Sequence, residues 1–143
     1  MKTESFRLPQ TIHPVNYDLS FEMDLTKFEF HGKESIDLEI SKPTSKIVLN
    51  ARDLEIKHVY LIYHKKSLKP KVNVDNDKEL VTLSFNENVK GAVKLCMDFD
   101  GKLTDNLVGF YRSKYLQNKS EKYLATTQFE APYARRAFPC FDD

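Results

Sequence analysis

A glutamine and a glutamate near the end of the chain are the first residues whose types and spacing could do chemistry. Residues 122–130, KYLATTQFE, alternate in the manner of a β-strand, and Gln128 and Glu130 stand two positions apart within them. Side chains two apart share one face of a strand, so an amide and a carboxylate would lie side by side at its end. From the pair alone, two readings stay open: a binding site, or simply the solvated face of a half-exposed strand.

Other chemically capable residues form no catalytic group in the sequence. The four histidines are scattered, and none stands at a metal-ligand spacing from a second histidine or a cysteine. There is no glycine-rich phosphate loop and no Gly-x-Ser-x-Gly motif. Arg135 and Arg136 are expected to pair with local carboxylates such as Asp142 or Asp143. Taken alone, these residues predict neither a metal site nor a catalytic site within the chain.

An apolar–polar alternation with a period of two predicts the elements that must hold this segment. Long alternating runs begin at Val15 and at Phe28; in the second, Gly32 suggests a bulge or bend, and Pro43 is expected to end the strand. Shorter strands are predicted at 47–51, 54–63, 72–74, 81–85 and 93–99. Because no useful stretch repeats every 3.6 residues, we predict an all-β domain over residues 10–100, an antiparallel β-sandwich or a strongly bent sheet.

The composition is that of an ordinary soluble globular domain. Of 143 residues, 41% are hydrophobic and 30% are charged, and the formal net charge is +1. Such balanced charge gives no basic field for nucleic acid, and the apolar runs are too short to span a membrane. The N-terminal residues lack the apolar core of a secretory signal, and Cys96 and Cys140 are too few for a disulfide framework. We therefore expect a cytoplasmic domain with two free thiols and neither nucleic-acid nor membrane partners.

The C-terminal run TQFEAPYARRAFPCFDD resembles the signature that closes the N-terminal β-domain of the M1 family of zinc aminopeptidases. GFYRSKY at 109–115 is similar to the puromycin-sensitive and archaeal tricorn-associated branches, and the opening RLPQTIHPVNYDLSFEMDLTKFEFHG fits the first strands of the same domain. The resemblance extends from about Arg7 to Asp143 and implies a saddle-like β-domain. The chain departs from the family where Pro132-Tyr133 replaces a common Thr-Asp. This puts in doubt any contact made by the missing aspartate.

The resemblance implies roles for the first two residues considered. Glu130 would be one of the carboxylates that hold the α-amino group of a peptide with a free N-terminus, and Gln128 would line the pocket for the first side chain. Residues 1–143 would form a single N-terminal domain, and the thermolysin-like catalytic domain, with its Gly-Ala-Met-Glu-Asn and His-Glu-x-x-His motifs, is absent from this chain. Zinc would be bound outside the chain, so we expect the isolated chain to be inactive.

The same resemblance predicts a docking surface. The missing catalytic domain would contact the C-terminal segment, and Tyr133, Phe138 and Phe141 are expected to be exposed without it. Two rival functions remain at this stage. One is a non-catalytic β-domain that serves as a protein-interaction scaffold, and the other is an epoxide-hydrolase-type relative. Retention of Gln128 and Glu130 in the order of the family favours the aminopeptidase over the scaffold, because a scaffold needs no amine anchor, but does not discriminate the epoxide-hydrolase case.

Overall fold

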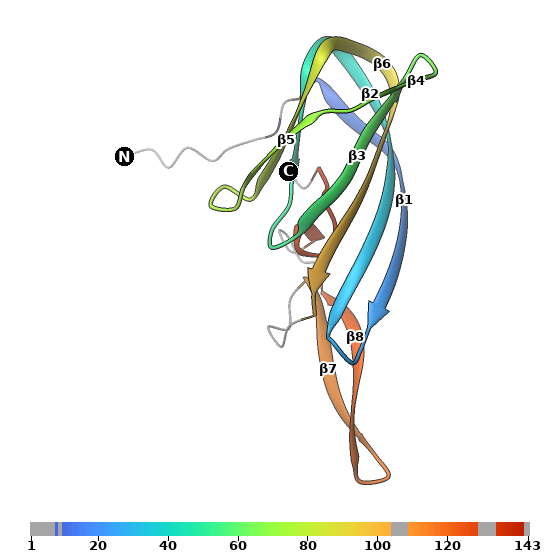
Figure 1. Cartoon of the computed structure of the whole chain (residues 1–143), viewed down its shortest axis with the longest axis vertical. Helices are drawn as coiled ribbons and strands as arrows, with labels where there is room; N and C mark the ends of the chain where they lie inside the picture. Colours follow the sequence, from blue (N-terminus) through green and yellow to red (C-terminus); the bar gives the residue numbers. More distant parts are fainter. Residues whose placement is uncertain (1–7, 9, 104–108, 129–133, 142–143) are drawn as a thin grey trace.

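The protein is built almost entirely from antiparallel strands, as a computed structural model shows (Figure 1). The structure describes residues 8, 10–103, 109–128 and 134–141, with the backbone alone at 109–115 and 126–128. Within these ranges there is no α-helix, and one 3₁₀ turn, η1 (Ala134–Arg136), is present. The all-β prediction is confirmed.

The main sheet contains six strands. Five follow the order β1-β2-β6-β3-β4, and β5 pairs with the N-terminal part of β6, at residues 80–84. Every pairing within it is antiparallel. The strands are β1 (Ile12–Asp24), β2 (Glu29–Asn50), β3 (Glu55–Tyr63), β4 (Lys66–Leu68), β5 (Lys71–Asp75) and β6 (Leu80–Lys102).

Two very long strands bend the sheet over on itself. β2 has 22 residues and β6 has 23, and together they curve over the upper end of the molecule in Figure 1. The bend coincides with register shifts on either side of Thr44. Pro43 lies in this interval, where its missing N–H breaks no regular ladder bond, so the prediction that it ends the strand is wrong. The predicted strands at 47–51, 81–85 and 93–99 are likewise parts of β2 and β6.

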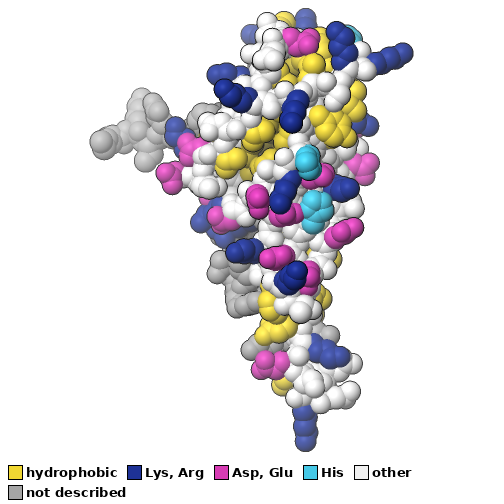
Figure 2. All heavy atoms as spheres, in the orientation of Figure 1, with side chains coloured by type: hydrophobic (Ala, Val, Ile, Leu, Met, Phe, Trp, Pro, Cys, Tyr) yellow, Lys and Arg dark blue, Asp and Glu magenta, His cyan; other side chains and the backbone are white. Residues whose placement is uncertain are grey.

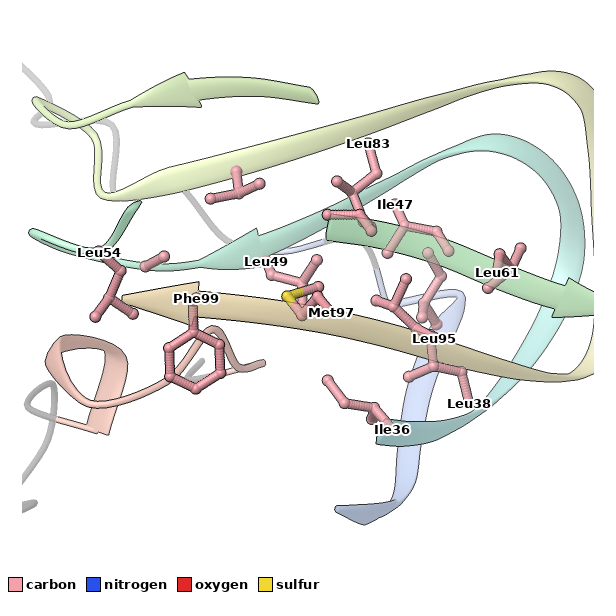
Figure 3. Packing of buried hydrophobic residues seen from close by; sticks show 14 of the residues in the cluster. Ile36, Leu38, Ile47, Leu49, Leu54, Leu61, Leu83, Leu95, Met97 and Phe99 are labelled. Atoms are coloured by element: carbon pink, nitrogen blue, oxygen red, sulfur yellow. The ribbon is translucent and has the colours of Figure 1, made fainter. Parts of the chain in front are cut away.

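The hydrophobic core lies between the two halves of the bent sheet. Figure 3 shows Ile47, Leu49 and Leu83 on one side and Leu38, Leu95 and Met97 on the other; all six are buried. Burial of such side chains contributes about 1.5–3 kcal/mol each. The predicted sandwich and the predicted bent sheet therefore describe one arrangement, in which a single sheet supplies both layers.

Gly32 is required by packing and marks no bulge. Its register with Phe21 in β1 and Phe99 in β6 is continuous. A Cβ atom at this position would overlap the ring of Phe99. The prediction of a bulge at Gly32 is therefore wrong: the glycine leaves room for an aromatic ring from the neighbouring strand.

The first strand is less buried than its alternation suggests. A register shift between Pro14 and Asn16 leaves Val15 71% exposed, because the bulge takes it out of the pleat. Beyond it, Tyr17 and Phe21 pack partly against the core, whereas other large apolar side chains of this strand remain exposed. One edge of the inner face thus keeps apolar surface in contact with solvent.

A separate hairpin projects from the lower end of the sheet in Figure 1. It consists of β7 (Gly109–Gln117) and β8 (Ser120–Gln128), paired antiparallel along their whole length. GFYRSKY is therefore the beginning of β7, which the alternation pattern alone had not assigned to a strand. Since a two-stranded hairpin is only marginally stable in water, its base needs support from the rest of the protein.

Candidate functional site

Gln128 is the last residue of β8, and its backbone pairs with Gly109, the first residue of β7. Glu130 lies outside the described residues, within 129–133, and so does Tyr133. The predicted arrangement of Gln128 and Glu130 on one face therefore stays a prediction. What the structure does define is how the chain is held on each side of residues 129–133.

The hairpin supports the N-terminal side of this segment. The rings of Tyr123 in β8 and Phe28, just before β2, meet edge-on with centroids 4.7 Å apart. Ala125, two residues further along β8, packs against the core cluster. The strand that ends at Gln128 is thus fixed to the main sheet a few residues earlier.

The C-terminal side is held by backbone hydrogen bonds to the end of β2. Asn50 and Cys140 form an antiparallel bridge, with N–H···O distances of 2.7 and 2.9 Å. The N–H of Phe141 also donates to the hydroxyl of Tyr17 at 3.0 Å. The side chains of Ala137 and Cys140, in the same segment, are buried in the core. The segment after η1 is therefore an integral part of the fold.

An ion-pair cluster adds a second attachment. Arg135 Nη1 donates to Glu79 Oε2 at 2.9 Å, and Arg52 Nη1 donates to Glu79 Oε1 at 2.8 Å. Arg135 thus pairs with a carboxylate 56 positions earlier in the chain. The predicted partners Asp142 and Asp143 lie outside the described residues. No local pattern in the sequence could have revealed this contact.

The predicted exposed docking surface is not formed by the two phenylalanines. Phe138 and Phe141 are half-buried and pack against the core of this chain, and the ring of Phe138 meets Tyr17 edge-on. That part of the expectation is wrong, because the C-terminal segment covers its own domain. The exposed large apolar side chains on the sheet and the hairpin include Val15, Leu19, Met23, Ile62, Leu116 and Leu124, and Leu25 is exposed in the turn after β1.

The sequence reading missed a buried carboxyl group in β2. Glu34 is 4% exposed, and neither carboxyl oxygen has a hydrogen-bond partner among the described residues. Its register neighbours are Leu19 and Met97, so its side chain faces the apolar interior. Desolvation raises the pKa of Glu34 to about 9, which leaves the group neutral at pH 7. Its shared parity with Ile36 is the signal that could have identified it.

The opposite face of the sheet is polar. Figure 2 shows lysines, acidic residues and histidines gathered over the middle of the long strands. His31 hydrogen-bonds to Asp100, which Lys57 also contacts at 3.1 Å. These interactions, first the His31 hydrogen bond, lower the pKa of Asp100. A shallow depression of about 450 Å³ elsewhere on the sheet is lined in part by Asp18, Lys33, His58 and Tyr60.

Neither a metal-ligand cluster nor a membrane-crossing helix is found in the described ranges. No three His, Cys, Asp or Glu side chains there are grouped so that they could hold a metal ion. No helix in the same ranges combines the length and apolar character needed to cross a membrane. Cys96 and Cys140 are both free thiols.

The bent antiparallel sheet, the projecting hairpin and the C-terminal segment bound back to the sheet define an all-β domain. The family model of the peptidase M1 N-terminal domain matches residues 13–143. The chain belongs to this family.

Curated relatives agree with this assignment. The chain is 40% identical over 143 residues to aminopeptidase M1 of Arabidopsis thaliana, covering 96% of the chain and 16% of that protein. It is 38% identical over 143 residues to the puromycin-sensitive aminopeptidase of Caenorhabditis elegans, covering 96% and 15%. Aminopeptidase 2 of Candida albicans is 36% identical over 145 residues, covering 100% and 15%. The chain thus spans about one sixth of the length of these relatives.

Proposed function

We propose that this chain is the substrate-anchoring N-terminal domain of an M1-type zinc aminopeptidase, which removes N-terminal residues from peptides. Glu130 binds the free α-amino group, and Gln128 lines the pocket for the first side chain. The observation that carries the proposal is the match of residues 13–143, a range that includes Gln128 and Glu130, to the peptidase M1 N-terminal domain. The names of the relatives and the family match support the reaction class.

The chemistry of the substrate explains why a carboxylate suits this role. An α-amino group has a pKa near 8, so the end of a peptide is readily cationic, whereas an internal peptide bond offers no such charge. A charge-assisted hydrogen bond from the ammonium to Glu130 is stronger than a neutral one. An internal segment would leave the carboxylate unpaired, which penalises cleavage away from the chain end.

Other parts of the proposed enzyme lie outside this chain. Membership in the peptidase M1 family supports zinc in the full-length protein, and we assign the ion to a catalytic domain elsewhere in that protein, where it would activate water. That domain would dock beside the C-terminal segment. Two free cysteines favour a reducing compartment such as the cytoplasm.

The proposal is tested by Glu130→Ala in the full-length protein. Loss of a charge-assisted hydrogen bond should lower kcat/KM for free-amine aminoacyl anilides by about 10- to 100-fold. Glu87→Ala, at an exposed position where β6 bends, is the matched control and should leave kcat/KM unchanged. An unchanged kcat/KM for Glu130→Ala would contradict the assigned role. Chelator-sensitive peptide hydrolysis by the isolated chain would contradict the division of labour between domains.

A further inference from the structure

β1 forms one edge of the main sheet and pairs with β2 alone among the described strands (Figure 1). Backbone N–H and C=O groups alternate in direction along an antiparallel strand, so half of those in β1 point away from β2. Such an edge is a template for pairing with another strand. The other end of the strand order differs, because β4 (Lys66–Leu68) is only three residues long and begins with a lysine.

The regular part of β1 that can pair extends over residues 16–22. Before it, the register shift between Pro14 and Asn16 interrupts the ladder. After it, Asp24 Oδ1 accepts two backbone N–H groups of the following turn, both at 2.9 Å. Residues 16–22 contain neither proline nor lysine, the residues with which natural sheets block an exposed edge.

Apolar side chains on the same strand remain in contact with solvent. Leu19, in the middle of residues 16–22, is 37% exposed, and Met23 is 50% exposed. Both follow the parity of the inner face, and Val15 adds exposed apolar surface beside the bulge. A strand added at this edge would therefore cover apolar surface as well as bond to the backbone.

The charges of β1 favour pairing with a second copy of this strand in one register. When residue 19 lies opposite residue 19 of an antiparallel copy, Asp18 faces Ser20 and Asn16 faces Glu22 on the polar face. Each carboxylate then meets a hydrogen-bond donor. Moving the centre to residue 18, 20 or 21 would place Asp18 opposite another carboxylate, which is destabilising. Moving it to residue 17 would run the pairing into the bulge.

The same register matches the apolar face. Leu19 meets Leu19 of the second copy, and Tyr17 lies opposite Phe21. Cross-strand aromatic pairs stabilise sheets, and both rings already pack against the core of their own chain. Since apolar side chains face apolar ones and polar side chains face polar ones, the two sheets would continue as one.

We propose that β1 is a homodimerisation edge, where residues 16–22 of two copies pair antiparallel about Leu19. The inference is independent of the proposed function, because it uses neither Gln128 nor Glu130. Across the two-fold axis the two Asp18 side chains are diagonal neighbours, about 7–8 Å apart. Their repulsion is weak and is screened by salt.

Sedimentation equilibrium of the 143-residue chain tests the association. We expect a monomer–dimer equilibrium with a Kd on the order of 10 µM, because the shared edge is short. The Kd should be lower in about 0.5 M than in about 0.05 M NaCl, since salt screens the Asp18 pair. A chain that stays monomeric at about 500 µM would overturn the proposal. Weaker association at high salt would overturn the register.

A charge placed at the centre of the edge locates the interface. Leu19→Lys sets two lysines opposite each other and should raise the Kd at least about 100-fold. Ile62→Lys is the matched control, because Ile62 is 39% exposed on β3 and should leave the Kd unchanged. Leu116→Lys, on the projecting hairpin, should also leave it unchanged. Dimerisation that survives Leu19→Lys, or that either control abolishes, would place the interface elsewhere and overturn the proposal.

Disulfide cross-linking tests the register and keeps a small apolar residue, which covers the case in which Leu19→Lys does not fold. In a Cys96→Ser background, Leu19→Cys should form a disulfide-linked dimer with oxidised glutathione, because residue 19 faces its own copy. Met23→Cys in the same background should not, since the two copies of residue 23 would lie roughly 26 Å apart. Equal cross-linking at both positions, or none at residue 19, would overturn the pairing about Leu19.

Discussion

Two glutamates that are largely shielded from water occupy opposite electrostatic environments in this domain. Glu34 faces the apolar interior of the bent sheet with neither oxygen hydrogen-bonded to a described residue. Glu79 lies at the junction of the sheet with the C-terminal segment and receives hydrogen bonds from Arg52 and Arg135. Both are acidic and neither is fully exposed, yet the first must be neutral to be buried whereas the second is satisfied as an anion.

The two glutamates differ in their effect on the fold: burial of Glu34 lowers stability, whereas Glu79 joins separate parts of the chain. Each oxygen of Glu79 has a partner from another part of the chain, so its charge orders the segments around it. Glu34 organises nothing comparable, because its neighbours in the register, Leu19 and Met97, offer no charged or hydrogen-bonding side-chain group to satisfy a carboxylate. The inner face therefore tolerates Glu34, whereas at the junction Glu79 joins segments that the Asn50–Cys140 bridge also holds.

The largest expected effect follows from neutralising Glu34 permanently. Because burial raises its pKa from 4.5 to about 9, the folded state retains a proton that the unfolded state releases between these values. The free energy of unfolding should therefore fall as pH rises across this window, by up to about 1.4 kcal/mol per pH unit. Glu34→Gln should remove this slope and stabilise the domain by about 3 kcal/mol at pH 7, as measured by urea unfolding at several pH values.

Glu39→Gln is the matched control for this experiment. Glu39 lies on the same strand but is exposed, so its replacement should leave the pH dependence as it is in the wild type. If Glu34→Gln retains the wild-type slope between pH 4.5 and 9, the carboxyl of Glu34 is not held neutral by the sheet.

The same two glutamates show which features of the structure can be predicted from the sequence alone. Alternation predicts the strands and, followed strictly, places Glu34 on the same inner face as Ile36. It cannot show that Pro43 lies in a bend that the long strand passes through, because the neighbouring strand determines the register. Nor can a local pattern pair Glu79 with Arg135, since that contact exists only once the sheet has folded. At the candidate site, the strand containing Gln128 was predictable, and its support by Phe28 was not.

A smaller effect is expected from Glu79 itself on stability. Glu79→Gln leaves two guanidinium groups with a neutral partner, and hydrogen bonds to charged groups contribute about 1.5–3 kcal/mol. The domain should lose about 2 kcal/mol in urea unfolding. Arg52→Gln should cost less than Arg135→Gln, because the Arg52 side chain is 41% exposed and that of Arg135 only 13%. The reverse order would show that the junction is held mainly through Arg52.

The smallest effect is expected at Asp100, a carboxylate that lies neither in the apolar interior nor at the junction with the C-terminal segment. Asp100 is 37% exposed and contacts His31 and Lys57, which lower its pKa. A lowered pKa stabilises the fold above the ordinary value of 3.8, and this contribution is lost as pH falls through the lower folded value. Solvent screens such a pair, so Asp100→Asn should cost only about 0.5 kcal/mol at pH 7. Raising the salt concentration should shrink this small difference more than the effect of Glu79→Gln, because the Arg135–Glu79 contact is less exposed to ions than the Asp100 contacts. If both effects fade equally with salt, the junction is as solvent-exposed as the polar face, and the contrast between a surface pair and an organising one no longer holds.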